Sequence, residues 1–257
     1  MAAYYNEFDP QAAAWLRELI KQGHIAAGDV DDRDMREVSP DDLKGYTQHH
    51  FFAGIGGWSY ALRLAGWDDT RPVLTGSPPC QPFSTAGKGL GVADERHLAP
   101  VWLELVKSIR PACIIGEQVA AAVNKDNWLD DLLNALEAEG YSTGAVVLPA
   151  CSVGSPHIRQ RLWFTARLAD TERRGLQGRA KQCLEESVLP AESSKDIDWN
   201  KSEWLLCGDG KQRPVEPSTF PLADGIPARV GRLRGYGNAI VPQVAAEIVK
   251  TIMEGAI

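Results

Sequence analysis

Two spacings of apolar residues along the chain predict where its helices and strands lie. An apolar face at helical spacing predicts a helix over residues 10–22, and Asp9 followed by Pro10 marks its start. That face consists of Ala12, Trp15, Leu16, Leu19 and Ile20. Other helices are predicted over residues 58–64, 94–109 and 127–140 and in a C-terminal segment that ends at Met253. Short apolar runs predict strands at 72–76, 112–116 and 141–151. Alternating strands and helices predict an α/β domain.

The composition supports one sizeable α/β domain with a small appendage. The chain has 257 residues, of which 44% are hydrophobic, and that is enough for a substantial core. No apolar run approaches the roughly 18 residues of a membrane-spanning helix. The N-terminus also lacks the basic and then apolar pattern of a signal peptide. We therefore expect a cytoplasmic protein with no membrane partner.

The cysteines suggest a free thiol rather than a metal site. There are five, at positions 80, 113, 151, 183 and 207, and no Cys-x-x-Cys pair occurs. An odd number of widely spaced cysteines suggests neither zinc ligation nor a disulfide framework, so no metal is expected. A reducing cytoplasm would suit a nucleophilic thiol.

The charge is unevenly distributed. The net charge is −7, and residues 1–45 carry ten acidic and five basic side chains. Residues 157–182 carry seven basic and two acidic ones. A basic face on an acidic body is compatible with contacts to nucleic-acid phosphates. A solvated, charged loop explains the basic run about equally well.

A proline-rich loop presents one of the cysteines. Residues 76–84 read Gly-Ser-Pro-Pro-Cys-Gln-Pro-Phe-Ser and follow the strand predicted at 72–76. Pro79 fixes its own φ and pushes Pro78 towards an extended conformation, which holds Cys80 at a defined point. Ligands and catalytic groups gather where strands of an open α/β sheet end. A cysteine buried only for packing needs no such flanks, so Cys80 is a candidate nucleophile.

A glycine-rich turn lies shortly before this loop. Residues 52–57, Phe-Ala-Gly-Ile-Gly-Gly, stand between a strand and the helix predicted at 58–64. Glycines let the backbone approach a ligand closely, and a helix N-terminus favours a negative group. The neighbouring His49 and His50 are expected to be structural. By itself such a turn is weak evidence for a cofactor site.

Taken together, the motifs at 52–57 and 78–81 resemble those of the cytosine-C5 DNA methyltransferases. Three more segments match that family: Glu117-Gln118-Val119, the Arg-x-Arg of Arg159 and Arg161, and Gly237-Asn238-Ala239-Ile240. The resemblance covers most of residues 50–168 and 228–257 and, less closely, 4–38. It departs from the family at Gln118, which is usually asparagine, and at His157, which is usually glutamine.

The resemblance implies a Rossmann-like, S-adenosylmethionine-dependent methyltransferase fold and a cofactor site. The implied cofactor contacts are Phe52, Gly54, Ile55, Gly56, Gly57, Glu7, Phe8, Asp34, Met35, Pro79, Leu98, Asn238 and Ala239. In this reading Glu7 binds the ribose hydroxyls, and Asp34 with Met35 reads the adenine edge. An acid at a strand end is well suited to ribose hydroxyls.

The implied catalytic residues are Cys80, Glu117 and Arg161. Carbon 5 of cytosine is a poor nucleophile, and a thiolate that adds at C6 makes it reactive. Glu117 is expected to hold N3, where protonation favours that addition. Arg161 is expected to contact O2 through a guanidinium that is always charged. The cytosine must leave the base stack to reach them.

The expected partner is double-stranded DNA, and the protein is expected to be a monomer. The implied DNA contacts are Gln81, Ser84, Arg159 and Arg232. The catalytic domain is predicted at residues 1–169 and 221–257, with a short, poorly structured target-recognition insertion at 170–220. The compact size of the chain and its brief recognition region suggest a bacteriophage, mobile-element or restriction–modification enzyme, in a bacterial host or phage-infected cell.

The order of the motifs departs from the family. Only residues 58–79 separate the glycine turn from Cys80, which leaves no room for the two further cofactor strands of the family. We interpret residues 1–45 as those strands in permuted order; the alternative is an unrelated cap. Permutation has a cost, because a right-handed crossover into the Cys80 strand would move the intervening helix to the other face of the sheet.

Other functions also fit these motifs. The chain could methylate cytosine in tRNA, or it could be a DNA-binding relative without activity. Retention of Cys80, Glu117 and Arg161 argues against the second. A modified cofactor could donate another group, and the sequence does not reveal the DNA target.

Overall fold

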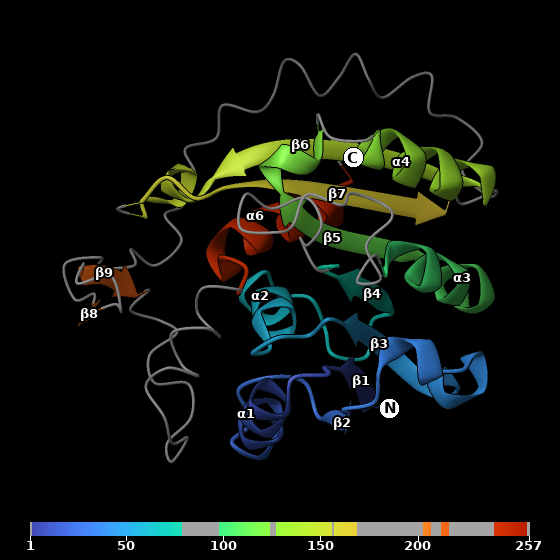
Figure 1. Cartoon of the computed structure of the whole chain (residues 1–257), viewed down its shortest axis with the longest axis horizontal. Coiled ribbons are helices and arrows are strands. Elements are labelled where there is room, and N and C mark those ends of the chain that lie inside the picture. The colour runs from blue at the N-terminus through green and yellow to red at the C-terminus, as the bar shows by residue number, and fades with distance from the viewer. Residues whose placement is uncertain are drawn as a thin grey trace.

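A computed structural model of the chain shows an α/β fold built around one large sheet (Figure 1). It describes residues 2–78, 98–123, 127–155, 157–168, 203–206, 212–215 and 239–255, with only the backbone at 203–206 and 212–215. Six residues with predicted roles lie outside this part: Pro79, Cys80, Gln81, Ser84, Arg232 and Asn238.

The sheet has seven strands in the order β2-β1-β3-β4-β5-β7-β6. The strands are β1 (Ala2–Asn6), β2 (Gly28–Asp31), β3 (Tyr46–Phe51), β4 (Val73–Gly76), β5 (Cys113–Val119), β6 (Tyr141–Pro149) and β7 (Gln160–Leu168). Neighbours from β2 to β5 pair in parallel, whereas β7 is antiparallel to both β5 and β6. The predicted α/β class is confirmed.

Helices cover both faces of the sheet. They are α1 (Pro10–Lys21), α2 (Gly57–Leu64), α3 (Ala99–Ile109), α4 (Trp128–Ala138) and α6 (Pro242–Met253). Short 3₁₀ turns lie at η1 (Met35–Glu37), η2 (Pro40–Leu43), η4 (Ala120–Val123) and η5 (Ala150–Val153). Asp9 caps α1 as predicted, since its carboxylate accepts hydrogen bonds from the amides of Gln11 and Ala12.

The register of the strands shows which residues pack on each face of the sheet. Tyr5, Thr75 and Ile115 lie in one row across the sheet and pack beneath α1, α2 and α6. The adjacent row contains Tyr4, Leu74 and Ile114, which pack with α3, α4 and the turns η1 and η2. Figure 1 shows the two groups of helices on opposite sides of the strands. Successive strand residues point to opposite faces, so each strand contributes to both halves of the core.

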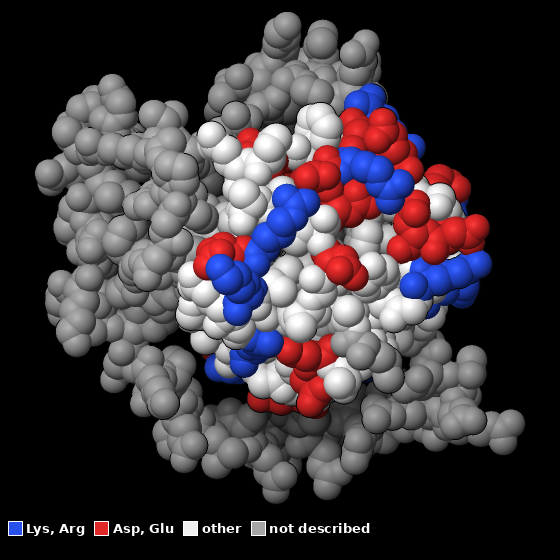
Figure 2. Space-filling view, turned by 90° about the horizontal axis from the view of Figure 1, so that it is seen from below, with Lys and Arg blue, Asp and Glu red and all other residues white. Residues whose placement is uncertain are grey.

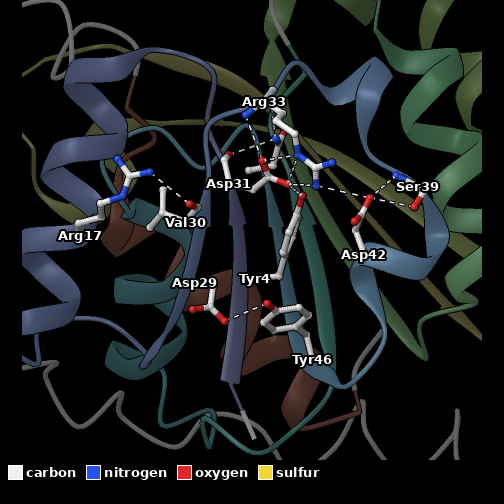
Figure 3. A network of polar contacts seen from close by, with 10 residues as sticks. Tyr4, Arg17, Asp29, Val30, Asp31, Arg33, Ser39, Asp42 and Tyr46 are labelled. Atoms are coloured by element: carbon white, nitrogen blue, oxygen red, sulfur yellow. Dashed lines mark hydrogen bonds and ion pairs between the residues drawn. The ribbon is translucent and has the colours of Figure 1, made fainter.

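The two N-terminal strands, β1 and β2, belong to the large sheet. β1 lies between β2 and β3 and is parallel to both. The edge strand β2 is held by two tyrosines: Tyr4 donates to Asp31 at 2.7 Å, and Tyr46 donates across β1 to Asp29 at 2.8 Å (Figure 3). β1 and β2 thus extend the sheet beyond β3.

Acidic and basic side chains are interleaved at this end of the molecule (Figure 2). Ion pairs join Arg17 to Asp32, Arg33 to Asp31 and Asp42, Arg36 to Asp34, and Lys44 to Asp41. The basic side chain of each pair is largely exposed to solvent, so the pairs contribute little to stability.

One crossover in the sheet has the opposite hand to the others. The connections β1–α1–β2 and β3–α2–β4 run in opposite directions across the sheet, yet both helices cover the same face. The connection β4–α3–β5 runs in the second direction but covers the other face. Reversing either the direction of a crossover or the face that its helix covers reverses its handedness, and reversing both leaves it unchanged. The crossovers β1–α1–β2 and β4–α3–β5 therefore have the same handedness, and β3–α2–β4 has the opposite one. Because nearly all such crossovers are right-handed, β3–α2–β4 is the left-handed one.

Strand β5 is longer than predicted. The apolar run suggested a strand at 112–116 that delivers Glu117 at its end, but β5 continues to Val119. Antiparallel pairing with β7 extends it, with Glu117 opposite Trp163 and Val119 opposite Arg161. Glu117 is therefore fixed within a strand.

Part of the predicted target-recognition region contains strands. β8 (Glu203–Leu206) and β9 (Gln212–Val215) pair antiparallel in a separate two-stranded sheet. Among the described residues, no helix is long and apolar enough to cross a membrane.

Candidate active site

Three strands, β1, β3 and β4, end in register at one edge of the sheet, and β5 runs three residues past that edge. Asn6, Phe51, Gly76 and Gly116 are neighbours across β1, β3, β4 and β5. The residues that follow them therefore line up along the carboxyl edge, where open α/β sheets bind ligands. Those residues are Glu7, Phe52, Ser77 and Glu117.

The predicted glycine turn follows β3 in a conformation that requires glycine. Gly54 has φ 57° and Gly56 has φ 80°, both in the left-handed region. Phe52 also has a positive φ, 52°, which is unusual for a bulky residue and marks local strain of the kind found at functional sites. Gly56 is the N-cap of α2, so the amides at the start of that helix face the edge of the sheet.

Glu7 is tied to this turn. Its Oε2 accepts a hydrogen bond from the Gly54 amide at 2.7 Å, and its Oε1 accepts one from the Asp9 amide at 2.9 Å. Burial raises the pKa of Glu7, and the two backbone donors oppose that rise. Each carboxylate oxygen has two lone pairs, so both can still accept a ligand hydroxyl.

The predicted cofactor contacts Phe8, Asp34, Met35 and Leu98 differ in how exposed they are and in what they contact. Phe8 follows Glu7 and is 67% exposed, whereas Met35 is buried in the core. The carboxylate of Asp34 accepts hydrogen bonds from the Arg36 amide and guanidinium, which lower its pKa to about 2. Leu98 is the half-buried N-cap of α3.

The C-terminal segment packs against the glycine turn. Ala239 contacts the cluster that contains Ala53 and Ile55. A β-carbon added at Gly57 would lie 2.9 Å from Cγ1 of Ile240, so glycine is needed for this close approach. Residues 239–240 and the turn therefore form one surface although they are far apart in sequence.

Glu117 and Arg161 form a buried ion pair. Nε of Arg161 lies 2.7 Å from Oε1 of Glu117, and the two side chains are only 20% and 10% exposed. Burial raises the pKa of Glu117, while Arg161 and Arg159 oppose the rise. A carboxyl group of raised pKa is a candidate proton donor at neutral pH.

Arg159 and His157 lie beside this pair. The guanidinium of Arg159 donates a hydrogen bond to the carbonyl oxygen of Ala239 at 2.8 Å, which joins the arginine segment to the C-terminal segment. Burial and the charge of Arg159 lower the pKa of His157. The two arginines thus have different partners: Arg161 meets an acid and Arg159 a backbone carbonyl.

Two contacts that sequence reasoning missed reach the residues just before Cys80. The indole of Trp58 donates to Oγ of Ser77 at 2.9 Å. The amide of Gln118 donates to the carbonyl of Pro78 at 3.4 Å. No local pattern reveals such contacts, since they join separate strands and a helix.

The fold and the motifs define the class and the family of the protein. The sheet has the Rossmann-like fold of S-adenosylmethionine-dependent methyltransferases. The family model for C-5 cytosine-specific DNA methylases matches residues 67–204, just over half of the chain. The chain belongs to that family.

Curated relatives of this chain are type II methyltransferases. M.HaeII from Haemophilus aegyptius is 35% identical over 163 residues, which cover 48% of this chain and 50% of the relative. M.NaeI from Lentzea aerocolonigenes is 28% identical over 162 residues, which cover 62% of this chain and 33% of the relative. The chain spans half or less of the length of these relatives.

Among solved structures, the S. pombe Dnmt2 methyltransferase has a TM-score of 0.42 and 13% identity over 81% of this chain and 65% of that chain.

Proposed function

We propose that this protein transfers a methyl group from S-adenosylmethionine to C5 of cytosine in duplex DNA, with Cys80 as the nucleophile. The observation that carries the proposal is the buried Glu117–Arg161 pair at the carboxyl edge of the sheet. Glu117 lies on β5, the strand next to β4, and β4 leads in sequence to Cys80. An acid paired with a cation matches what nucleophilic addition of a thiolate to a cytosine ring needs.

The chain's residues act in sequence. Cys80 adds as a thiolate to C6, while Glu117 delivers a proton to N3. The addition breaks the C5–C6 double bond, and the ring electrons then make C5 nucleophilic. Arg161 stabilises the ring through O2 and keeps Glu117 oriented. When bound, S-adenosylmethionine supplies the methyl group that C5 receives. Finally the C5 proton passes to water, the C6–S bond breaks, and the thiolate and the Glu117 proton return to their starting states.

The residues at the edge of the sheet fit the proposed cofactor. Glu7 would accept the ribose hydroxyls, and the exposed ring of Phe8 would lie against the adenine. The left-handed glycines leave the backbone of the turn open to the cofactor. Asp34 would need to share its carboxylate with Arg36 in order to accept from the adenine amino group.

The permuted order of the cofactor strands is part of this proposal. β1 pairs with the glycine-turn strand β3, and β2 pairs with β1, although both precede β3 in sequence. The family match begins at residue 67, after the glycine turn. Both observations support the interpretation that residues 2–45 supply the ribose and adenine strands ahead of the turn.

The remaining assignments rest on the sequence. We propose residues 170–220 as the target-recognition region, and Gln81, Ser84 and Arg232 as contacts to DNA. For Arg159, the bond to Ala239 favours a role in joining the active-site segments over a phosphate contact. We propose that the enzyme acts as a monomer in the cytoplasm of a bacterial host or phage-infected cell.

The test uses duplex DNA that contains 5-fluorocytosine, together with S-adenosylmethionine. Fluorine at C5 does not leave as a cation, so the enzyme should stay covalently attached to the DNA. We expect an adduct that resists denaturant and is lost in Cys80→Ala. Folded protein that binds the cofactor but forms no adduct with a sequence-diverse DNA pool would contradict the proposal. An adduct with fluorocytosine-containing tRNA alone would assign the activity to RNA.

A further inference from the structure

The two residues that precede Pro79 are each held by a side chain from another element. Ser77 and Pro78 follow β4, and Cys80 comes two residues after Pro78. Trp58 holds the side chain of Ser77, and Gln118 holds the carbonyl of Pro78. The start of the Cys80 loop is thus fastened to α2 on one side and to β5 on the other.

The hydrogen bond from Trp58 is directional and well supported. Trp58 is 2% exposed and is the second residue of α2, directly after the glycine turn. Its indole meets Trp163 edge-on, with ring centroids 5.8 Å apart and an interplanar angle of 85°. An indole has one donor, which usually finds a partner when buried. Packing on Trp163 therefore aims that donor at Ser77.

The amide of Gln118 also has a defined orientation. Its Oε1 accepts a hydrogen bond from the Val119 amide at 2.8 Å, so the NH₂ group must be the end that faces the Pro78 carbonyl. Gln118 is 1% exposed and adjoins Glu117 in β5. At 3.4 Å the bond to Pro78 is long, and we expect it to be the weaker of the two.

The left-handed crossover explains why Trp58 reaches Ser77. The helix α2 joins β3 directly to the adjacent strand β4, and it stays on the face that it shares with α1 and α6. The first turn of α2 therefore lies over the end of β4 as well as that of β3. The glycine turn and the Cys80 loop are thereby connected through one side chain.

We propose that Trp58 and Gln118 are positioning residues that set the direction in which the Cys80 loop leaves β4, and so align the thiol with Glu117 and the glycine turn. This inference rests on the proposed function. A shift of about 1 Å at the start of the loop would misalign a nucleophile enough to slow attack by up to roughly a hundredfold. Neither side chain touches a reacting atom in this account.

The experiment measures the single-turnover rate of adduct formation on fluorocytosine DNA with saturating cofactor. Trp58→Phe keeps the edge contact with Trp163 but removes the donor, and Ser77→Ala removes the acceptor. Each is expected to slow adduct formation by about tenfold. The double variant should be no slower than either single variant, because both remove the same bond. Gln118→Leu should slow the reaction less, in keeping with its longer bond, and Gln118→Asn should restore part of the rate.

Trp67→Phe is the matched control. Trp67 is also buried, and its indole donates to the carbonyl of Arg71 in the loop after α2, away from the Cys80 loop. Trp67→Phe should lose about as much thermal stability as Trp58→Phe, while its rate of adduct formation should equal that of the wild type. If Trp58→Phe and Gln118→Leu react as fast as Trp67→Phe, or if the Trp58 and Ser77 effects multiply, the positioning role is wrong. An inactive wild-type enzyme would instead contradict the proposed function.

Discussion

Nε of Arg161 lies 2.7 Å from Oε1 of Glu117, and antiparallel pairing of β5 with β7 brings the two together from positions 44 residues apart in the sequence. Both side chains are largely removed from solvent. A buried carboxylate is costly without a cation beside it. The two residues that should hold the cytosine ring therefore also stabilise one another when no ring is bound.

Arg161→Met should destabilise the protein in a manner that depends on pH. Loss of the cation leaves Glu117 buried and unpaired, which costs about 3 kcal/mol at pH 8. Without Arg161 the pKa of Glu117 should rise further above its unfolded value. The folded state then binds the proton more tightly, so stability returns as pH falls through that raised pKa. Urea unfolding at pH 8 and pH 5.5 measures this. In Arg161→Met/Glu117→Gln the loss of stability relative to Glu117→Gln should be the same at both pH values, and a difference would refute the explanation.

Glu117→Gln should separate catalysis from folding. The amide keeps the size of the side chain but cannot deliver a proton to N3, so adduct formation should slow by about 10² to 10⁴. Cofactor affinity should stay within about twofold of the wild type. Glu104→Gln, at an exposed position on α3, provides the matched control and should leave the rate unchanged. An adduct rate in Glu117→Gln close to wild type would rule out the acid role.

The sequence predicts α1 and α4 closely because each has an apolar face of its own, whereas the helix predicted at 94–109 begins only at Ala99. The predicted spans 10–22 and 127–140 differ from α1 and α4 by no more than two residues at either end. Boundaries that depend on a distant partner could not be predicted in this way. The extension of β5 to Val119 arises from pairing with β7, which no local pattern reports.

Contacts within the site also depend on partners that are distant in the sequence, and local patterns did not predict them. The resemblance names Glu117 and Arg161 separately, but their ion pair depends on strand register. The sequence likewise did not predict that the guanidinium of Arg159 donates to the Ala239 carbonyl, 80 residues further along the chain. The sequence also left two outcomes open for α2. The helix α2 lies on the face of the sheet that it shares with α1 and α6, and its crossover is left-handed. It stays on that face because Trp58, Ala61 and Leu62 pack with α6 in the core.

Glu7→Gln should weaken cofactor binding with little effect on folding. The Gly54 amide donates to one carboxylate oxygen of Glu7, and the Asp9 amide donates to the other. A glutamine can satisfy only one of them and loses the charge that favours ribose hydroxyls. We expect the Kd for S-adenosylmethionine to rise tenfold or more, measured by calorimetry. Asp32→Asn changes an exposed acid that pairs with Arg17 and should leave the Kd unaltered. Equal Kd values for the two variants would count against Glu7 as the ribose ligand.

His50→Gln should reduce the loss of folding stability that the wild type shows as pH falls. The ring of His50 is buried, stacks on Tyr5 with centroids 4.8 Å apart, and bonds Thr75 at 2.8 Å and Gln48 at 3.2 Å. Burial and then the neighbouring His49 lower the pKa of His50 to about 3. Between the ordinary histidine pKa and that value, the unfolded chain binds a proton that the folded protein refuses. Stability that is present at neutral pH is therefore lost as pH falls, at about 1.4 kcal/mol per pH unit. Urea unfolding at pH 7.5 and 5.5 should show wild type losing roughly 1.4 kcal/mol more than His50→Gln over this interval. The same loss in both proteins would mean that the ring accepts its proton in the folded state.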